Sequence, residues 1–287
     1  MSYYSFGLIG YPLGHSYSPS LHQAALRTAG LDGEYRLYPV PPFPGGEADL
    51  RRLLERLRRA ELDGLNVTIP HKQNVLALVD ELTTTAWRIG AANLIFRREG
   101  RLVGDNTDAV GFLQDLKAFL ASAGVKNTRR ALVLGAGGAA RAVIAGLLAD
   151  RWQVLVTARR PEQAHALAAS LDPNLLEVIE LDPTCLTQLN RISLVVNATP
   201  IGMYPQVEAS PWPSDAPLPP GAAVYDLVYN PPQTALLQAA RSAGLPAQGG
   251  LGMLVEQAAL AFECWTGRPA SRQAMRQAAE ELDRKEE

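Results

Sequence analysis

The sequence predicts an α/β protein built from two domains. A short apolar run at Ala131–Leu134 leads through a glycine-rich turn into a helix-forming stretch, and strand and helix patterns then alternate as far as Val228. Such alternation is typical of a parallel sheet covered by helices. Because about 130 residues precede the glycine-rich turn, another domain comes first. We expect the last long helix to return to it, which gives a first α/β domain of residues 1–106 and 245–287, completed by C-terminal helices, and a second domain of residues 107–244.

Composition and charge narrow the class of protein. The chain has 287 residues, 47% of them hydrophobic and 20% charged, which is enough for two hydrophobic cores. A net charge of −2 argues against nucleic acid or an anionic membrane as the main partner. The chain contains no apolar run of membrane-spanning length and no signal-peptide pattern at its N-terminus, so we expect a cytoplasmic protein. We expect it to be either a monomer or a homodimer. Cys185 and Cys264 lie far apart without metal-ligand spacing, and we expect two reduced, buried thiols and no metal site.

The first domain begins with a strand at Ser5–Gly10. A helix follows, with Ser18 predicted as its N-cap, Pro19 at its first helical position and Gly30 as its stop. The patterns after it predict, in order, a strand at 35–40, a helix at 47–60, a strand at 64–69, a helix at 70–81, strands at 91–98 and 101–104, and a helix at 108–123.

The second domain is predicted to contain five strands. These lie at 131–134, 154–157, 176–179, 194–196 and 223–228, and the proline-rich stretch from Pro200 to Pro220 forms a loop between the last two. The final long helix is predicted at 251–266.

The glycine-rich turn predicts a dinucleotide site. Gly135 permits a tight turn, Gly137 allows phosphates to approach the backbone, and Ala140 stands where a small residue packs helix against strand. A turn of this kind places a pyrophosphate at a helix N-terminus, as in Rossmann-type domains.

The second strand of this domain ends in Thr157-Ala158-Arg159-Arg160. A site for NAD carries an acidic residue here for the ribose 2′-hydroxyl, and none is present. Arginine accommodates a 2′-phosphate instead. The sequence therefore favours NADP, the alternative being two solvated arginines.

Two hydroxyl side chains, Ser16 and Ser18, stand at the start of the first helix. A helix N-terminus carries unpaired N–H groups and partial positive charge, so this position suits a carboxylate. The alternative is that Ser18 only caps the helix.

Lys72 follows Pro70 in the predicted first turn of a helix, where the helix dipole disfavours a cation. Burial favours the neutral form of an amine, which acid–base chemistry requires. The alternative is a solvated surface lysine. Gly104-Asp-Asn-Thr-Asp108 carries more polar groups than one helix cap needs, although Asp108 alone could serve as a cap. We expect Lys72 and Asp108 to be partners.

Gln257 shares a predicted helix face with Leu254, Ala258 and Ala261. An amide on an apolar face must satisfy its hydrogen bonds, either with a bound polyol or with a backbone carbonyl.

Together these segments resemble the shikimate dehydrogenase family, from Phe6 to Thr266. The motifs that carry the resemblance are Ser16-x-Ser-Pro19, Asn66-Val-Thr-Ile-Pro-x-Lys72, Gly104-Asp-Asn-Thr-Asp108, Gly135-Ala-Gly-Gly-Ala139, Asn197-Ala-Thr-Pro-Ile-Gly-Met203, Tyr225-Asp226 and Gly250-Leu-Gly-Met-Leu-Val-x-Gln257. The resemblance implies reversible reduction of 3-dehydroshikimate to shikimate with NADPH, in aromatic amino-acid biosynthesis.

The resemblance also implies a role for each site residue. Lys72 and Asp108 would be the catalytic pair, with Lys72 accepting the proton of the hydroxyl that is oxidised. The substrate would be bound by Ser16, Ser18, Asn66, Thr68, Lys72, Asn93, Asp108, Tyr229 and Gln257. The cofactor would be bound by Gly135, Ala136, Gly137, Gly138, Ala139, Ala158, Arg159, Arg160, Thr199, Leu227 and Gly250.

Three alternatives stay open at this point. A quinate/shikimate dehydrogenase with broader substrate or NAD use is the nearest. A methylenetetrahydrofolate dehydrogenase also pairs a lysine with a nucleotide domain, but the Ser-x-Ser helix start favours a small polyhydroxy acid over a pterin. A non-catalytic dinucleotide-binding regulator would need neither Lys72 nor Asp108.

Overall fold

The computed structural model describes residues 3–125, 128–171, 174–180, 182, 189 and 191–286. The chain forms two compact units, one made of Met1–Gly111 and Val255–Glu287, the other of Phe112–Leu254. Both boundaries between the units fall inside helices, α4 (Asp108–Ala123) and α9 (Leu251–Thr266). They lie 5 and 10 residues after the positions that the sequence predicts.

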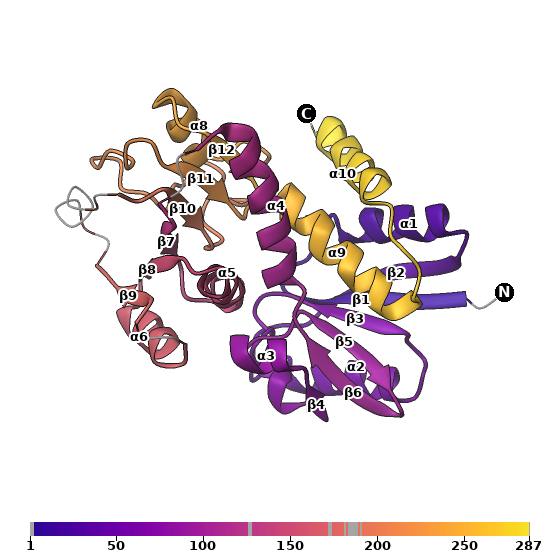
Figure 1. The fold of residues 1–287 in the computed structure, drawn as a ribbon. Helices are drawn as coiled ribbons and strands as arrows, with labels where there is room; N and C mark the ends of the chain where they lie inside the picture. Colours follow the sequence, from indigo (N-terminus) through magenta and orange to yellow (C-terminus); the bar gives the residue numbers. More distant parts are fainter. Residues whose placement is uncertain are drawn as a thin grey trace. The chain divides into compact units, whose positions relative to one another are not determined.

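The first unit is built around a six-stranded mixed sheet with the order β2-β1-β3-β5-β6-β4. Figure 1 shows the strands with the helices around them. The elements of this unit besides α4 and α9 are β1 (Tyr3–Gly10), α1 (Ser18–Ala29), β2 (Asp32–Pro39), α2 (Glu47–Arg58), β3 (Gly64–Val67), β4 (Glu81–Leu82), α3 (Thr84–Ile89), β5 (Leu94–Arg98), β6 (Arg101–Asp105) and α10 (Arg272–Glu286).

Strand directions in this sheet bring several chain segments to one edge. β1 runs parallel to β3, whereas β5 is antiparallel to both β3 and β6. The carboxyl ends of β1, β3 and β6 and the start of β5 therefore share an edge. The segments that leave this edge include residues 11–18, 68–72, 91–93 and 106–108.

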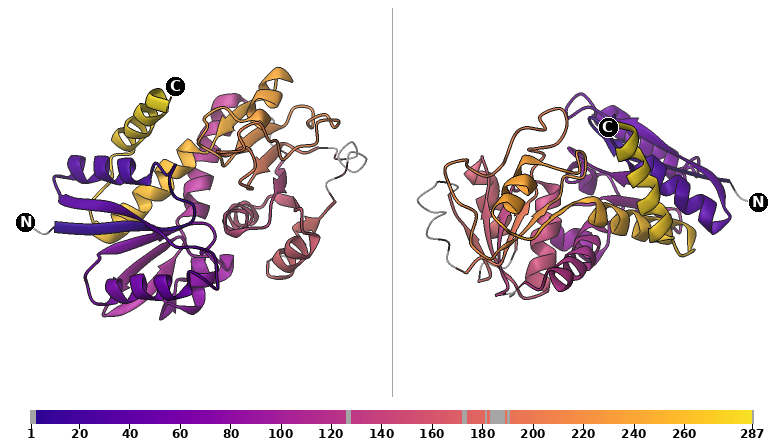
Figure 2. Two further views of the ribbon diagram at one scale, coloured as in Figure 1. Left: turned by 180° about the vertical axis from the view of Figure 1, so that it is seen from behind. Right: turned by 90° about the horizontal axis from the view of Figure 1, so that it is seen from above.

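The two faces of this sheet are covered by different helices (Figures 1 and 2). Helix α2 buries Leu50, Leu53, Leu54 and Leu57 in a cluster with residues of β1 and β3, because its leucines recur at helical spacing. On the other face, Phe6 stacks on Trp265 of α9 at 4.6 Å between ring centroids.

The second unit is built around a six-stranded parallel sheet with the order β12-β11-β10-β7-β8-β9. Two halves run outward from the neighbouring strands β7 and β10, which is the strand order of dinucleotide-binding sheets. The elements of this unit are β7 (Arg130–Leu134), α5 (Gly138–Ala149), β8 (Gln153–Thr157), α6 (Pro161–Ala169), β9 (Leu176–Val178), β10 (Leu194–Asn197), β11 (Ala223–Asp226), α8 (Ala235–Ser242) and β12 (Ala247–Gly249).

Hydrophobic clusters lie on both faces of the parallel sheet. One joins alternate strand residues such as Val133 and Val196 to α5, α6 and the part of α4 from Phe112 onward. The other joins Leu132 and Val195 to α8 and to Trp212 in the proline-rich segment. A sheet covered on both faces explains why its strands are continuous apolar runs.

The structure corrects several predictions about single elements. Pro70 does not begin a helix, and the segment contains only a short 3₁₀ turn at Asn74–Ala77. The Lys72 carbonyl accepts a hydrogen bond from the Ala92 N–H at 2.8 Å, so a tertiary contact takes the place of a helical one. Cys264 is exposed, so its predicted burial is wrong, and Cys185 lies outside the described residues.

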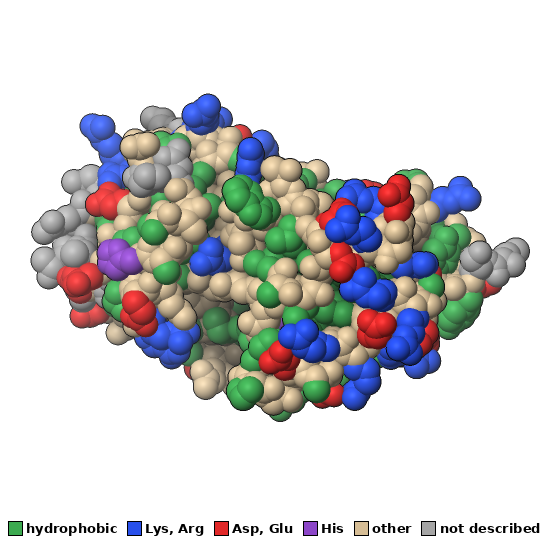
Figure 3. All heavy atoms as spheres, turned by 90° about the horizontal axis from the view of Figure 1, so that it is seen from below, with side chains coloured by type: hydrophobic (Ala, Val, Ile, Leu, Met, Phe, Trp, Pro, Cys, Tyr) green, Lys and Arg blue, Asp and Glu red, His purple; other side chains and the backbone are tan. Residues whose placement is uncertain are grey.

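Basic and acidic side chains are interleaved on the face shown in Figure 3. On α2 and the strands beside it they form ion pairs, among them Arg51 with Glu47 at 2.8 Å and Arg58 with Asp80 at 2.6 Å. Exposed pairs of this kind contribute little to stability.

Within the described ranges, none of the helices has the length and apolar character needed to cross a membrane.

Candidate active site

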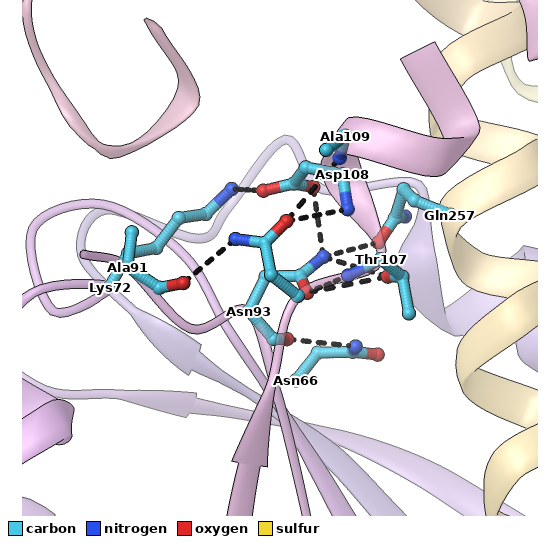
Figure 4. A network of polar contacts seen from close by, with 9 residues as sticks. Asn66, Lys72, Ala91, Asn93, Thr107, Asp108, Ala109 and Gln257 are labelled. Carbon is cyan, nitrogen blue, oxygen red and sulfur yellow. Dashed lines mark hydrogen bonds and ion pairs between the residues drawn. The ribbon is translucent and has the colours of Figure 1, made fainter. Parts of the chain in front are cut away.

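The candidate active site lies at the edge of the first sheet where the strand ends meet. Lys72 lies on the segment after β3, Asn93 directly precedes β5, Asp108 is the first residue of α4, and Gln257 projects from α9. Figure 4 shows these four side chains converging. The shared edge, together with α9, thus unites residues that are up to 185 positions apart in the chain.

Lys72 and Asp108 form a short ion pair. The distance from Lys72 Nζ to Asp108 Oδ2 is 2.6 Å, and the two side chains are 15% and 5% exposed. The interpretation of Lys72 as a solvated lysine is therefore wrong. An amine held against a carboxylate with little access to water can hold or release one proton at a fixed place.

Asn93 is the centre of the surrounding hydrogen-bond network (Figure 4). Its Nδ2 donates to Asp108 Oδ1 at 2.8 Å, to Thr107 Oγ1 at 2.9 Å and to Gln257 Oε1 at 3.2 Å. An amide nitrogen has two hydrogens, so three acceptors compete for two donors. A ligand hydroxyl that replaces one of these acceptors leaves no donor of Asn93 unused.

Asp108 begins α4 without capping it. Asn106 Oδ1 accepts from the N–H groups of Asp108 at 3.0 Å and Ala109 at 3.3 Å, while Asn106 Nδ2 donates to the Ala91 carbonyl. The amide of Asn106 thus takes the role of a cap. Both Asp108 oxygens stay available to Lys72 and Asn93, so the interpretation of Asp108 as a helix cap is wrong.

Asn66 supports the same network from the next strand. Its Nδ2 donates to the Asn93 carbonyl at 3.1 Å, and its Oδ1 accepts from the Tyr35 hydroxyl at 2.8 Å. Tyr35 stacks on the buried ring of His22, and burial lowers the pKa of His22 to about 3, which keeps that ring neutral. Sequence reasoning missed Tyr35, because no residue near it in the chain indicates that its hydroxyl donates a hydrogen bond to Asn66.

Ser16 and Ser18 lie at the start of α1, although not in the predicted positions. Tyr17 is the N-cap, Ser18 is the first helical residue, and the Ser16 hydroxyl accepts from the Ser18 N–H at 3.3 Å. The prediction of Ser18 as N-cap is wrong by one residue, since Tyr17 holds that position and its side chain makes no capping hydrogen bond. The first turn contains no acidic side chain, so the positive end of α1 is open to an anion.

Thr68 directly follows β3 and lies beside the end of β1. Its N–H donates to the Ile9 carbonyl at 2.8 Å. It therefore leaves the same sheet edge as the chain that leads to Ser16.

The glycine turn of the second unit leads directly into α5 and leaves open space at the start of that helix. Gly135 has a φ of 113°, and a Cβ there would lie 3.1 Å from the Ala198 carbonyl oxygen and from Thr199 Cγ2. Gly137 is the N-cap of α5, and a Cβ on it would meet nothing within 4 Å. The first turn of α5 has no side-chain cap and no acidic residue, so its N–H groups suit a phosphate.

The other residues predicted to bind the cofactor follow strand ends at the same edge of the parallel sheet. Arg159 and Arg160 are exposed, and neither makes an ion pair within the part of the chain that the structure describes. The strands and the predicted residues that follow them are β7 with Ala136, Gly138 and Ala139, β8 with Ala158, Arg159 and Arg160, β10 with Thr199, β11 with Leu227, and β12 with Gly250. Tyr229 also follows β11 and so belongs to the second unit, whereas the other residues predicted to bind substrate belong to the first.

Buried hydrogen bonds of Asn197 and Asp226 fix the turns after β10 and β11. Asn197 Oδ1 accepts from the Thr199 hydroxyl at 2.7 Å, and its Nδ2 donates to Asp226 Oδ1 at 2.8 Å. Asp226 also accepts from the Thr234 hydroxyl and the Val228 N–H. Burial raises the pKa of Asp226 to about 6, although these donors oppose the shift. The motifs at 197–203 and 225–226 signalled these residues without indicating their role.

Three family models match successive parts of the chain. The shikimate dehydrogenase substrate binding domain matches residues 8–95, the shikimate / quinate 5-dehydrogenase model residues 120–203, and the shikimate 5′-dehydrogenase C-terminal domain residues 250–280. The shikimate dehydrogenase (NADP(+)) of Shouchella clausii is 41% identical over 270 residues, which cover 94% of this chain and 95% of that protein.

The chain belongs to the shikimate dehydrogenase family.

Solved structures agree with this assignment. Shikimate 5-dehydrogenase from Thermus thermophilus, in complex with NADP(H) and shikimate, superposes with a TM-score of 0.83 at 39% identity, covering 97% of this chain and 99% of that one. Quinate dehydrogenase from Corynebacterium glutamicum, in complex with NAD, gives a TM-score of 0.86 at 30% identity, covering 98% and 100%. The similar solved structures thus include one complex named for shikimate and one enzyme named for quinate.

Proposed function

We propose that this protein catalyses the reversible NADP-dependent reduction of 3-dehydroshikimate to shikimate. The observation that carries the proposal is the 2.6 Å pair of Lys72 and Asp108 within the Asn93–Gln257 network. A member of a dehydrogenase family that keeps an acid–base pair beside amide groups has what oxidation of a ring hydroxyl requires. A non-catalytic nucleotide sensor would need no such pair.

Different residues of the first unit bind different groups of the substrate. Ser16 and Ser18 hold the carboxylate at the positive end of α1, and Thr68 contributes from the neighbouring strand end. Lys72, Asn93, Asp108 and Gln257 bind the ring hydroxyls, with Asn66 supporting Asn93. Tyr229 of the second unit completes the predicted set.

Lys72 moves the proton in both directions. In oxidation, its neutral amine accepts the proton of the reacting hydroxyl. In reduction, its ammonium returns a proton to the oxygen of the former ketone, and Asp108 stabilises the ammonium form between these steps. NADP, when bound by the second unit, would supply the hydride chemistry at the hydroxyl-bearing carbon.

The second unit supplies the groups that would hold NADP. The turn at Gly135–Ala139 and the first turn of α5 receive the pyrophosphate, while Arg159 and Arg160, next to Ala158, bind the 2′-phosphate. Thr199, Leu227 and Gly250 line the nicotinamide side.

The test is a cofactor-reduction assay with shikimate and quinate, each against NADP and NAD, followed at the absorbance of the reduced nicotinamide. We expect shikimate with NADP to give by far the highest kcat/KM. Quinate with NAD at equal or higher kcat/KM would instead support the second candidate, a broader quinate/shikimate dehydrogenase, which the similarity to the Corynebacterium structure favours. No turnover with any pair would overturn the enzyme assignment.

A further inference from the structure

The turn that carries Ser16 and Ser18 is tied to the last helix of the chain. Tyr17, between the two serines, is buried at 2% exposure, and its hydroxyl donates to Asp283 Oδ1 at 2.5 Å. Asp283 lies in the final turn of α10, which packs alongside α1 (Figures 1 and 2). The hydrogen bond joins residues 266 positions apart and fixes the N-cap of α1 from outside that helix.

The placement of Asp283 runs against the local preference of its helix. The C-terminal end of a helix carries partial negative charge, so a carboxylate in the last turn is electrostatically disfavoured. A phenol hydroxyl that donates to that carboxylate offsets this cost and satisfies a donor buried with its ring. The hydrogen bond therefore holds the Tyr17 ring against the end of α10.

Holding Tyr17 also holds the backbone on both sides of it. The Tyr17 carbonyl accepts from the Leu21 N–H at 3.2 Å as the first helical bond of α1, and the Ser16 hydroxyl accepts from the Ser18 N–H. Moving the Tyr17 ring would rotate the peptide groups that aim the two serine hydroxyls. An anion site at a helix start depends on the orientation of such hydroxyl groups.

We propose that Asp283 is a positioning residue for substrate, acting through Tyr17 on the Ser16–Ser18 turn. The inference rests on the proposed function, in which this turn binds the substrate carboxylate. Helix α10 thus takes part in substrate binding through Tyr17.

The experiment measures KM for shikimate, KM for NADP and kcat for Asp283→Ala, Tyr17→Phe and the double variant. We expect each single variant to raise KM for shikimate by about 3–10-fold, the loss that one displaced hydrogen bond produces. KM for NADP and kcat should change by less than about twofold. The double variant should be no worse than the worse single one, because both remove the same hydrogen bond.

Glu281→Ala is the matched control, since Glu281 is an exposed acidic residue of the same helix. It should leave all three parameters unchanged. Asp283→Asn, which keeps an acceptor oxygen, should restore most of the affinity and gives a second measurement if the alanine variant does not fold.

An unchanged KM for shikimate in folded Asp283→Ala would overturn the positioning role, and so would equal losses in both KM values and kcat, which would indicate general loosening. The variants Ser16→Ala and Ser18→Ala test the proposed function separately from the positioning role of Asp283. If neither serine variant raises KM for shikimate, the carboxylate assignment is wrong, whatever Asp283 does.

Discussion

Lys72 and Asp108 combine two demands that usually conflict. Little of either side chain reaches water, which makes an isolated charge costly, yet catalysis requires the amine to gain and lose a proton. The arrangement meets both demands because Asn93 donates to the second carboxylate oxygen while Lys72 occupies the first. Asp108 thus keeps a hydrogen-bond partner when Lys72 is neutral.

Replacing Lys72 by alanine should lower kcat by about 10²–10⁴-fold, the usual contribution of a positioned acid–base group. The variant must be shown to be folded, since Asp108 would lose its cation. Lys117→Ala is the matched control, because Lys117 is 61% exposed and pairs with Asp150 at the longer distance of 3.3 Å. Near-normal kcat in folded Lys72→Ala would remove the assigned role.

Asp226 should make stability depend on pH in a definite direction. Its pKa rises from 3.8 to about 6 on folding, so its stabilising contribution is complete below pH ~4 and is lost as the pH rises through about 6. The shift corresponds to about 3 kcal/mol. Asp226→Asn removes this titration, so its free energy of unfolding relative to the parent should increase between pH ~4 and ~7.

Denaturant unfolding of both proteins across this range measures that difference and cancels the contribution of other titrating groups. A difference that stays constant across the same pH range would contradict the assignment of the raised pKa to Asp226.

Among the elements, α4 and α9 determine how Gln257 reaches Asn93. Gly111 lies on α4 against the backbone of Gln257, where a Cβ would come within 2.8 Å of the Gln257 nitrogen. A glycine inside a helix is intrinsically unfavourable. Its presence here is explained by the close approach of the two helices, which no larger residue allows.

Gly111→Ala should therefore destabilise the protein by about 1–3 kcal/mol, since an overpacked contact with backbone outweighs the gain in helix propensity. Thermal or denaturant unfolding measures the effect. Val110→Ala, at the exposed neighbouring position of the same helix, should change stability by less than about 0.5 kcal/mol. Increased stability of Gly111→Ala would show that the helices separate freely at this point.

Local sequence signals predicted some elements and failed for others. The helices predicted at 108–123 and 251–266 are confirmed as α4 and α9, because their buried apolar residues recur at helical spacing. The helix predicted after Pro70 is wrong, since the contact between Lys72 and Ala92 is invisible to local patterns. The strands β4 (Glu81–Leu82) and β12 (Ala247–Gly249) were missed, because neither contains an apolar run.

The same distinction applies to the site. Lys72, Asp108 and Gln257 could be named from motifs and Asn93 from the family resemblance, and the distances now define the contacts among these four side chains. Tyr35 and Asp283 could not, because each matters only through a partner that is distant in the chain. The roles of the predicted site residues in binding and catalysis stay predictions until the variants are measured.

At the scale of the whole molecule, the two sheets differ in kind. The sheet of the second unit is parallel throughout and comes from one continuous stretch, which is why alternation of strand and helix predicted it. The sheet of the first unit is mixed, and its polar edge depends on antiparallel β5 entering between β3 and β6. No sequence pattern specified that strand order.

The first unit is interrupted by the second and resumes only at Val255. During synthesis, every residue of the inner unit leaves the ribosome before Gln257, Trp265 and Asp283 do. The parallel sheet of the second unit can therefore finish folding while the first unit still lacks its C-terminal helices. A chain released early, without its segment Val255–Glu287, would retain all the groups proposed to bind NADP, but it would lack Gln257 and the anchor for Tyr17. Dinucleotide affinity alone would then be a poor measure of intact enzyme in a preparation that contains shortened chains.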